Sequence, residues 1–222
     1  MTPSREFRER EVAWRVFAHE LNASRVEVRG AGDRGRSYLL SPLGATMNRV
    51  LLSGRIVGVD RMAGENPLLR ARVEDPTGSC TVTGSSFHPR TLAYLSQVVP
   101  PQEVLVIGKT HCFVSERGVS YISVRAEAIV PVDPVRSVAH LLDIAEATTE
   151  RLVLGRTLRR SDPPGREELL NRGIPPMLVD GALEAVAGYP GLDLEPYTRA
   201  VEAVISRLES MAVSSTGPSA GA

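Results

Sequence analysis

The sequence predicts a small closed β-barrel with one inserted helix, because five short apolar runs occur in a distinctive order within residues 49–130. Three runs come first, a helix-like stretch at Arg90–Val98 follows, and two runs complete the segment; this order is the signature of the oligonucleotide/oligosaccharide-binding (OB) fold. Gly54, Gly58 and Gly108 fall inside runs, where a glycine marks the bulges or bends that barrel closure requires. The predicted strands are Val50–Val59, Leu68–Glu74, Ser79–Gly84, Val104–Val114 and Val119–Val130.

An amphipathic helix is predicted ahead of the barrel, over Ser4–Ala23. Apolar residues recur there at near-helical spacing among charged residues, and Asn22 closes the run. Glycines then interrupt the stretch Val26–Gly44, which we expect to form a hairpin-like lead-in that packs on the barrel.

A tight turn is predicted at Asp75–Gly78, because proline fixes φ near the start of the turn and glycine suits its exit. The residues on either side should therefore pair as a hairpin. Successive side chains of a strand point to opposite faces, so one set faces inward and the other outward. The inward set is Ala71, Val73, Cys80 and Val82, and the outward set is Arg70, Arg72, Thr81 and Thr83. The outer surface of this hairpin is the usual ligand surface of the fold.

The region after the barrel is predicted to be helical throughout. Pro131 and Pro134 end the last strand, and apolar residues then recur with helical spacing over Val135–Arg159. The segment Ser161–Gly165 breaks the pattern, and Asp162 is expected to cap the next helix. Further helices are predicted at Arg166–Asn171, Met177–Ala187 and Leu194–Met211.

Four segments result from this pattern. The N-terminal helix and lead-in occupy residues 1–47, the barrel 48–134, a helical domain 135–211 and a disordered tail 212–222. The helical domain carries apolar stripes, so we expect it to fold independently and to contact another protein. The tail is too poor in apolar residues to fold.

Composition limits the possible functions. The 222 residues can bury a core without a metal or disulfide. Two cysteines, no signal peptide and no bilayer-length apolar run predict a cytoplasmic protein without membrane contact. The formal net charge is zero, so any contact with nucleic acid must be local. Nearly all the cationic charge is arginine, which stacks on bases and forks onto phosphates; Lys109 is the only lysine.

The sequence holds no P-loop, dinucleotide fingerprint, nucleophile elbow or paired metal-ligand motif, and we predict that the protein is not an enzyme and needs no cofactor. The nearest approach to a metal cluster is Cys80, His88, His111 and Cys112. None of the zinc spacings is met, and adjacent residues on a strand point to opposite faces. We expect core cysteines and surface histidines, with a metal-dependent enzyme as the alternative.

Single-stranded nucleic acid is bound by flat side chains that stack on bases and by cations that contact phosphates. The predicted barrel offers both, in the set Arg55, Arg70, Arg72, Thr81, Thr83, Phe87, Lys109, Tyr121 and Arg125. Packing is an equal alternative for Phe87 and Tyr121, and Phe113 is expected to pack at the barrel's end. A second cationic set either reaches phosphates or forms an ordinary solvated face: Arg151, Arg156, Arg159, Arg160 and Arg166.

Trp14 and Phe17 are candidates for contact with a protein partner. On an amphipathic helix left uncovered by the barrel, they would form the apolar patch of such an interface. The alternative is that this helix packs on its own barrel.

Several stretches resemble the archaeal replication protein A family, in particular the proteins called RPA-associated proteins. They are Arg10–Ser24, Ser41–Val50, Arg70–Gly78, Val106–Lys109 and Ile122–Glu127, so the resemblance covers about residues 5–155. In outline the barrel is also similar to the middle subunit of eukaryotic replication protein A. The resemblance implies a single-OB accessory subunit that joins a larger subunit in protecting single-stranded DNA during replication and repair. It supplies no catalytic or ligand residues.

Two binding functions therefore stay open. One is an accessory subunit of replication protein A that binds single-stranded DNA, with the large subunit or other replication and repair proteins as partners. The other is an OB-fold protein-interaction subunit without direct DNA binding, which the neutral charge and the 5% aromatic content favour.

Overall fold

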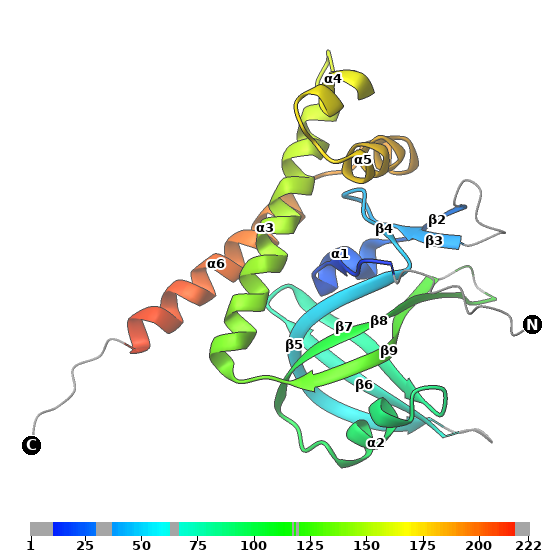
Figure 1. The fold of residues 1–222 in the computed structure, drawn as a ribbon, viewed down its shortest axis with the longest axis vertical. Helices are drawn as coiled ribbons and strands as arrows, with labels where there is room; N and C mark the ends of the chain where they lie inside the picture. Colours follow the sequence, from blue (N-terminus) through cyan, green and yellow to red (C-terminus); the bar gives the residue numbers. More distant parts are fainter. Residues whose placement is uncertain (1–10, 30–36, 63–66, 117, 119, 216–222) are drawn as a thin grey trace, which may run out of the picture.

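In a computed structural model, the chain forms a β-barrel, and the helices that follow the barrel in the sequence gather toward one end of it (Figure 1). The structure describes residues 11–29, 37–62, 67–116, 118 and 120–215. The barrel strands are β5 (Arg49–Met62), β6 (Leu68–Asp75), β7 (Gly78–Ser85), β8 (Gln102–Val114) and β9 (Ser120–Pro131), with α2 (Pro89–Gln97) between β7 and β8.

The strand order confirms the predicted fold class. β5 pairs with β6 and β6 with β7, β7 runs parallel to β9, β9 pairs with β8, and β8 closes the barrel against β5. This is the strand connection of an OB-fold. Helix α2 packs at one end of the barrel, where its buried Leu95 lies against Gly84 of β7.

The predicted hairpin is confirmed down to its register. Ala71 pairs with Val82, and Val73 pairs with Cys80. All four side chains are buried in the main core, so the outward set faces away from it. Alternation along two short strands was sufficient to assign both faces.

Glycines permit close strand approaches at two of the three predicted positions, Gly54 and Gly108. A Cβ added at Gly54 would lie 2.4 Å from the carbonyl oxygen of Glu74, and one at Gly108 would lie 2.4 Å from that of Arg125. The ladder shifts register between Ile56 and Gly58, and again at Gly108. A bulge is confirmed at Gly58 and at Gly108, and these bulges bend the strands as barrel closure requires; no register shift occurs at Gly54.

The predicted N-terminal helix is wrong over most of its described length. Trp14–Arg15 forms the short strand β1, parallel to β5, and only Ala18–Ala23 is helical, as α1. The backbone N–H of Ala18 donates to Asp75 Oδ2 at 2.7 Å, and that of His19 donates to Thr77 Oγ1 at 3.1 Å. The β6–β7 turn thus satisfies the free N–H groups at the helix start, while pairing with β5 holds the preceding residues extended. The part of the prediction at residues 4–10 lies outside the described residues.

The lead-in forms a second small sheet of three strands. β2 (Val26–Arg29) and β3 (Ser37–Leu40) pair as antiparallel strands, and β4 (Thr46–Met47) joins β3. Buried Leu39 and Met47 belong to the same core cluster as the barrel interior. The lead-in therefore packs on the barrel, as expected.

Four helices follow the barrel close to their predicted bounds. They are α3 (Pro134–Leu158), α4 (Arg166–Asn171), α5 (Pro176–Gly188) and α6 (Glu195–Ser215). Asp133 caps α3, whereas α4 begins after Gly165 and not at the predicted cap Asp162. Helix α6 runs four residues past its predicted end, and the predicted tail beyond Ser215 lies outside the described residues. No helix in the described part of the chain is long and apolar enough to cross a membrane.

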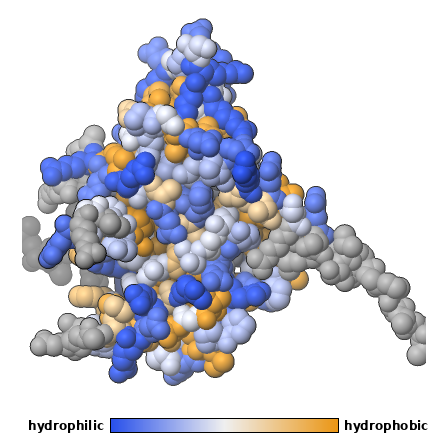
Figure 2. Space-filling view, turned by 180° about the vertical axis from the view of Figure 1, so that it is seen from behind, coloured by the Kyte–Doolittle hydropathy of each residue, from blue (hydrophilic) through white to orange (hydrophobic). Residues whose placement is uncertain are grey.

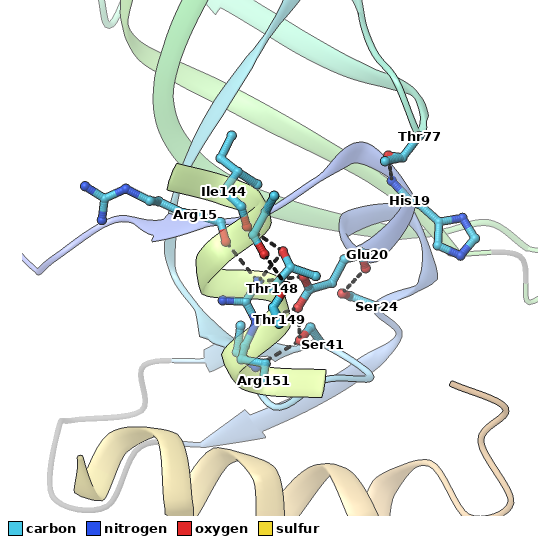
Figure 3. A network of polar contacts seen from close by, with 12 residues as sticks. Arg15, His19, Glu20, Ser24, Ser41, Thr77, Ile144, Thr148, Thr149 and Arg151 are labelled. Carbon is cyan, nitrogen blue, oxygen red and sulfur yellow. Dashed lines mark hydrogen bonds and ion pairs between the residues drawn. The ribbon is translucent and has the colours of Figure 1, made fainter. Parts of the chain in front are cut away.

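A buried ion pair joins α3 to α1. The Arg151 guanidinium donates to both carboxylate oxygens of Glu20, at 3.1 and 2.7 Å, and the two side chains are 3% and 1% exposed. Arg151 also donates to the carbonyl oxygen of Arg15 at 2.9 Å, and Ser41 Oγ donates to Glu20 at 2.8 Å (Figure 3). We call this set the Glu20–Arg151 network. Arg151 of α3 thereby contacts Glu20 of α1 and Arg15 of β1, both more than a hundred residues away in the chain.

A second contact joins α5 to the lead-in. A Cβ on Gly181 would lie 2.0 Å from the carbonyl oxygen of Gly44, so only glycine allows this approach. Nearby, Tyr189 Oη donates to the carbonyl oxygen of Leu40 at 2.7 Å and accepts from the N–H of Arg25 at 2.8 Å. The boundary predicted at residues 134/135 therefore crosses tightly packed contacts, and we expect the barrel and the helical region to unfold together.

Candidate functional site

One row of side chains crosses the outer face of the barrel over four strands. Register pairs Arg70 with Thr83, Thr83 with Arg125, and Arg125 with Lys109. Paired residues on adjacent strands project from the same face, so these four side chains are neighbours. With strands about 4.8 Å apart, the row is roughly 14 Å long.

A second row lies two residues further along the strands. Arg72 pairs with Thr81, Thr81 with Ser123, and Ser123 with His111. Cationic side chains therefore occupy both rows. We call Arg70, Arg72, Lys109 and Arg125 the cationic face.

The bulge at Gly108 aligns the β8 and β9 halves of this face. Ile107 pairs with Ala128, whereas Gly108 pairs with Ala126, so Glu127 is the extra residue on β9. Beyond the bulge, Lys109 and Arg125 come into direct register. Without this register shift, Lys109 and Arg125 would not be cross-strand partners on the same face.

The charges of the cationic face have weak partners. Arg70 lies 3.6 Å from Asp60, and Arg72 lies 3.6 Å from Glu74, with side chains of both pairs well exposed. Within the described ranges, no carboxylate forms an ion pair with Lys109 or Arg125. Exposed ion pairs contribute about 0–1 kcal/mol, so a phosphate can displace or share these partners at little cost.

His111 adds a flat ring to the second row and little charge. Desolvation by burial and the neighbouring Arg125 both lower the pKa of His111 below its usual 6.5. The imidazole is therefore mostly neutral at pH 7.

Two aromatic rings lie at the α1 end of the face. Phe113 and Tyr121 are cross-strand partners, and each is 58% exposed. The expectation that Phe113 packs in the barrel end is therefore wrong. Phe87 is also strongly exposed, beyond the end of β7 and just before α2. Exposed rings therefore lie beyond the cationic face at two places. Phe113 and Tyr121 lie at its α1 end, and Phe87 lies past the end of β7.

Arg55 does not join this face. Its Nε and Nη2 both lie 2.8 Å from Glu103 Oε1, and Arg55 lines a crevice of about 390 Å³ between the barrel, α3 and α6. Two of the guanidinium nitrogens are therefore already engaged by a carboxylate. Seven of the nine predicted site residues are assembled on the outer face; Arg55 lies apart and Phe87 lies beyond the end of β7.

Trp14 and Phe17, the candidates for contact with a protein partner, pack within the chain itself. Phe17 is 1% exposed and packs with Leu43 and Leu141 in a core shared with α3 and α6. Trp14 is partly buried, and the Arg151 guanidinium lies 5.9 Å from its ring centroid. The predicted partner-binding role of this pair does not fit these positions; the alternative of packing within the chain does.

Most of the second cationic set also has partners within the chain. Arg151 belongs to the Glu20–Arg151 network, and Arg166 forms a double contact with Asp180 at 2.6 and 3.1 Å. Arg156 donates to Thr198 at 2.6 Å, and Arg159 donates to two backbone carbonyl oxygens. Hydrophilic residues are concentrated at the helical tip of the molecule, as the blue area at the top of Figure 2 shows. These contacts favour a structural role.

No three His, Cys, Asp or Glu side chains come together as metal ligands among the residues that the structure describes. Burial raises the pKa of the Cys80 thiol to about 12, and burial also raises that of Cys112. Both thiols are therefore protonated at neutral pH. Cys80 lies inside the barrel, as expected.

Sequence reasoning missed Ser123, His111 and Phe113 as members of the face. Alternation from Lys109 reaches His111 and then Phe113, and alternation between Tyr121 and Arg125 reaches Ser123. The signal was therefore present in the sequence. His111 was predicted to be a surface histidine, but alternation was not followed from Lys109 to place it on this face.

Comparisons with known proteins find similar solved structures. The second single-stranded DNA-binding protein (SSBb) of Mycobacterium smegmatis is 23% identical, over 40% of this chain and 89% of that one, with a TM-score of 0.34. The mitochondrial single-stranded DNA-binding protein Rim1 of S. cerevisiae is 17% identical, over 39% and 96%, with a TM-score of 0.32. An OBody bound to hen egg-white lysozyme is 11% identical, over 38% and 81%, with a TM-score of 0.32. No protein-family model matches the sequence, and no curated protein matches it.

Proposed function

We propose that this protein is an accessory subunit of an archaeal replication protein A complex and binds single-stranded DNA on the outer face of its OB barrel. The observation that carries the DNA-binding part is the cationic face, where four cations lie in two rows of an exposed sheet. The subunit role rests on the sequence resemblance to the RPA-associated proteins. The protein acts by binding and not by catalysis.

The chemistry of the face suits a single strand. Arg70, Arg72, Lys109 and Arg125 contact backbone phosphates, and the exposed rings of Tyr121 and Phe113 stack on bases. Stacking of this kind requires unpaired bases, which a duplex does not offer. With zero net charge on the whole chain, attraction is confined to this face, and affinity is modest without a partner subunit.

A fluorescence titration at fixed salt tests the DNA-binding part. We expect labelled single-stranded DNA to bind more tightly than a duplex of the same length. Equal or tighter binding to the duplex would contradict the role of the stacking rings. Absence of binding to both would favour the alternative below.

The alternative is an OB-fold subunit that contacts only protein. The zero net charge and the low aromatic content favour it, because few groups are available for base stacking. Both proposals make this chain a subunit of a complex. Mixing the protein with a large subunit of replication protein A and following co-elution tests that role. We expect a stable complex, and separate elution at micromolar concentrations would contradict an accessory role with this partner.

A further inference from the structure

The helical end of the molecule carries an apolar groove that the proposed DNA-binding role does not use. It lies between α3, α6 and the connection from α4 to α5, with a volume of about 890 Å³. Its apolar lining includes Leu142, Val153, Leu154, Leu178, Val201 and Ile205. We call this feature the α3 groove.

The wall opposite α3 is fixed by the turn after α4. Gly173 has φ +82°, in the left-handed region that favours glycine, and it ends α4. The N–H of Ile174 then donates back to the carbonyl oxygen of Leu169 at 3.3 Å, closing the helix end. Ile174 and Pro175 are thereby directed along the groove. The groove is thus formed by regular, hydrogen-bonded backbone.

Large apolar side chains of the groove are exposed to water. Leu142 and Val153 on α3 are 48% and 56% exposed, and Ile205 on α6 is 44% exposed. Leu142, Glu146, Thr149 and Val153 recur at helical spacing, so they share one face of α3. A partner that covered the exposed apolar side chains would gain about 25 cal/mol of free energy for each Å² of apolar surface buried.

The α3 side of the groove is acidic. Asp143, Glu146 and Glu150 line it within two turns, and no ion pair to Glu146 or Glu150 occurs within the described part of the chain. Like charges at positions i and i+4, here Glu146 and Glu150, destabilise a helix. These acidic side chains therefore do not stabilise the isolated chain. The cation across the groove, Arg172, is paired with Glu168 of its own helix. An apolar floor with an acidic rim is complementary to an apolar stripe flanked by cations.

We infer that the α3 groove binds an amphipathic helix of another protein, one that carries apolar residues at i, i+3 or i+4, and i+7 and Lys or Arg beside them. The groove-lining residues of α3 run from Leu142 to Thr157, a rise of roughly 22 Å. A partner helix of about four turns fits that length. The site is separate from the cationic face, which lies on the barrel strands.

Selection from a library of displayed 16-residue peptides, with the full chain as bait, tests this inference. Val153→Glu places a charge in the floor without disturbing a buried residue, and it serves as the counter-selection bait. We expect enriched peptides with the apolar helical period and with Lys or Arg on its flanks. No enrichment, or enriched peptides that lack this pattern or are acidic, would overturn the inference.

The best peptide is then measured by fluorescence anisotropy against four proteins. Relative to the unchanged chain, we expect at least tenfold weaker binding to Val153→Glu and, independently, to Glu146→Lys/Glu150→Lys. Glu184→Lys is the matched control, because Glu184 is exposed on α5 and outside the groove. Single-stranded DNA binding should be equal in all four, so failure here is distinct from failure of the DNA-binding proposal.

Two further outcomes would overturn the inference. Equal peptide binding by all four proteins would show that the peptide binds elsewhere, and it would overturn the inference. Concentration-dependent dimerisation that Val153→Glu abolishes would show that a second copy of this chain occupies the groove. That result would contradict binding of a helix from another protein.

Discussion

The outer face of the barrel and the contact between α3 and α1 use arginine in opposite ways. On the barrel, Arg70 and Arg72 lie 3.6 Å from exposed carboxylates. In the other region, Arg151 lies 2.7 Å from Glu20, and water reaches neither side chain. An exposed pair holds little free energy and stays available to a ligand, whereas a buried pair is costly to break. The first region suits binding, and the second holds the fold together.

Removal of residues 136–222 has the largest expected effect on this comparison. The fragment 1–135 would expose Phe17 and Leu43 and would remove the cation that pairs with Glu20. We expect the fragment to lose cooperative unfolding in circular dichroism. A soluble fragment with a sharp unfolding transition would instead support an independent helical domain, with its boundary at residues 134/135.

Replacing Arg151 by methionine tests the buried pair alone. Glu20 would keep its burial and lose its partner, so we expect the free energy of unfolding in urea to fall by about 3–5 kcal/mol. Arg166→Met is the control, because the Arg166–Asp180 pair is exposed and should change the stability little. Similar losses in both variants would show that burial is not what distinguishes them.

Gly181→Ala tests the backbone contact between α5 and the lead-in. The added methyl would meet the carbonyl oxygen of Gly44, so one of the two segments must move. We expect a loss of about 1–3 kcal/mol, typical of overpacking. Gly58→Ala is the matched control, since a Cβ there meets no atom within 4 Å. Its effect on unfolding should be near zero, and equal effects would contradict the close approach.

Tyr121→Ala tests the ring at the end of the cationic face. Loss of one base stack should weaken binding of single-stranded DNA by about 1–3 kcal/mol, measured by fluorescence titration. Because no charge is removed, the salt dependence should not change. Tyr121→Phe keeps the ring and should bind like the unchanged protein. If it binds as weakly as Tyr121→Ala, the hydroxyl matters and not stacking.

The two regions also differ in how far the sequence predicts them. Pairing of Arg70 with Thr83 and of Arg72 with Thr81 follows from one turn at Asp75–Gly78 and from strand alternation, both local signals. Pairing of Thr83 with Arg125 needs closure of the barrel, which the order of the elements predicted through the OB-fold. The assembly of the cationic face was therefore largely predictable.

The region around Glu20 was not predictable in the same way. Nothing near Glu20 in the sequence identifies Arg151 as its partner, and the predicted helix at residues 4–23 ignored the pairing of Trp14 with β5. Tertiary contacts overrode helical periodicity there. Arg55 shows the same limit, since only the fold reveals that Glu103 is beside it.

The salt dependence of DNA binding tests the central claim most directly. For Arg70→Ala/Arg72→Ala, the slope of log affinity against log salt concentration should fall by roughly 0.7 for each phosphate that the variant no longer binds, with the melting temperature unchanged. Arg55→Ala, which removes an arginine already paired with Glu103, should keep the slope of the unchanged protein. A slope that stays the same in the double variant, or falls equally in Arg55→Ala, would contradict binding of single-stranded DNA by the cationic face.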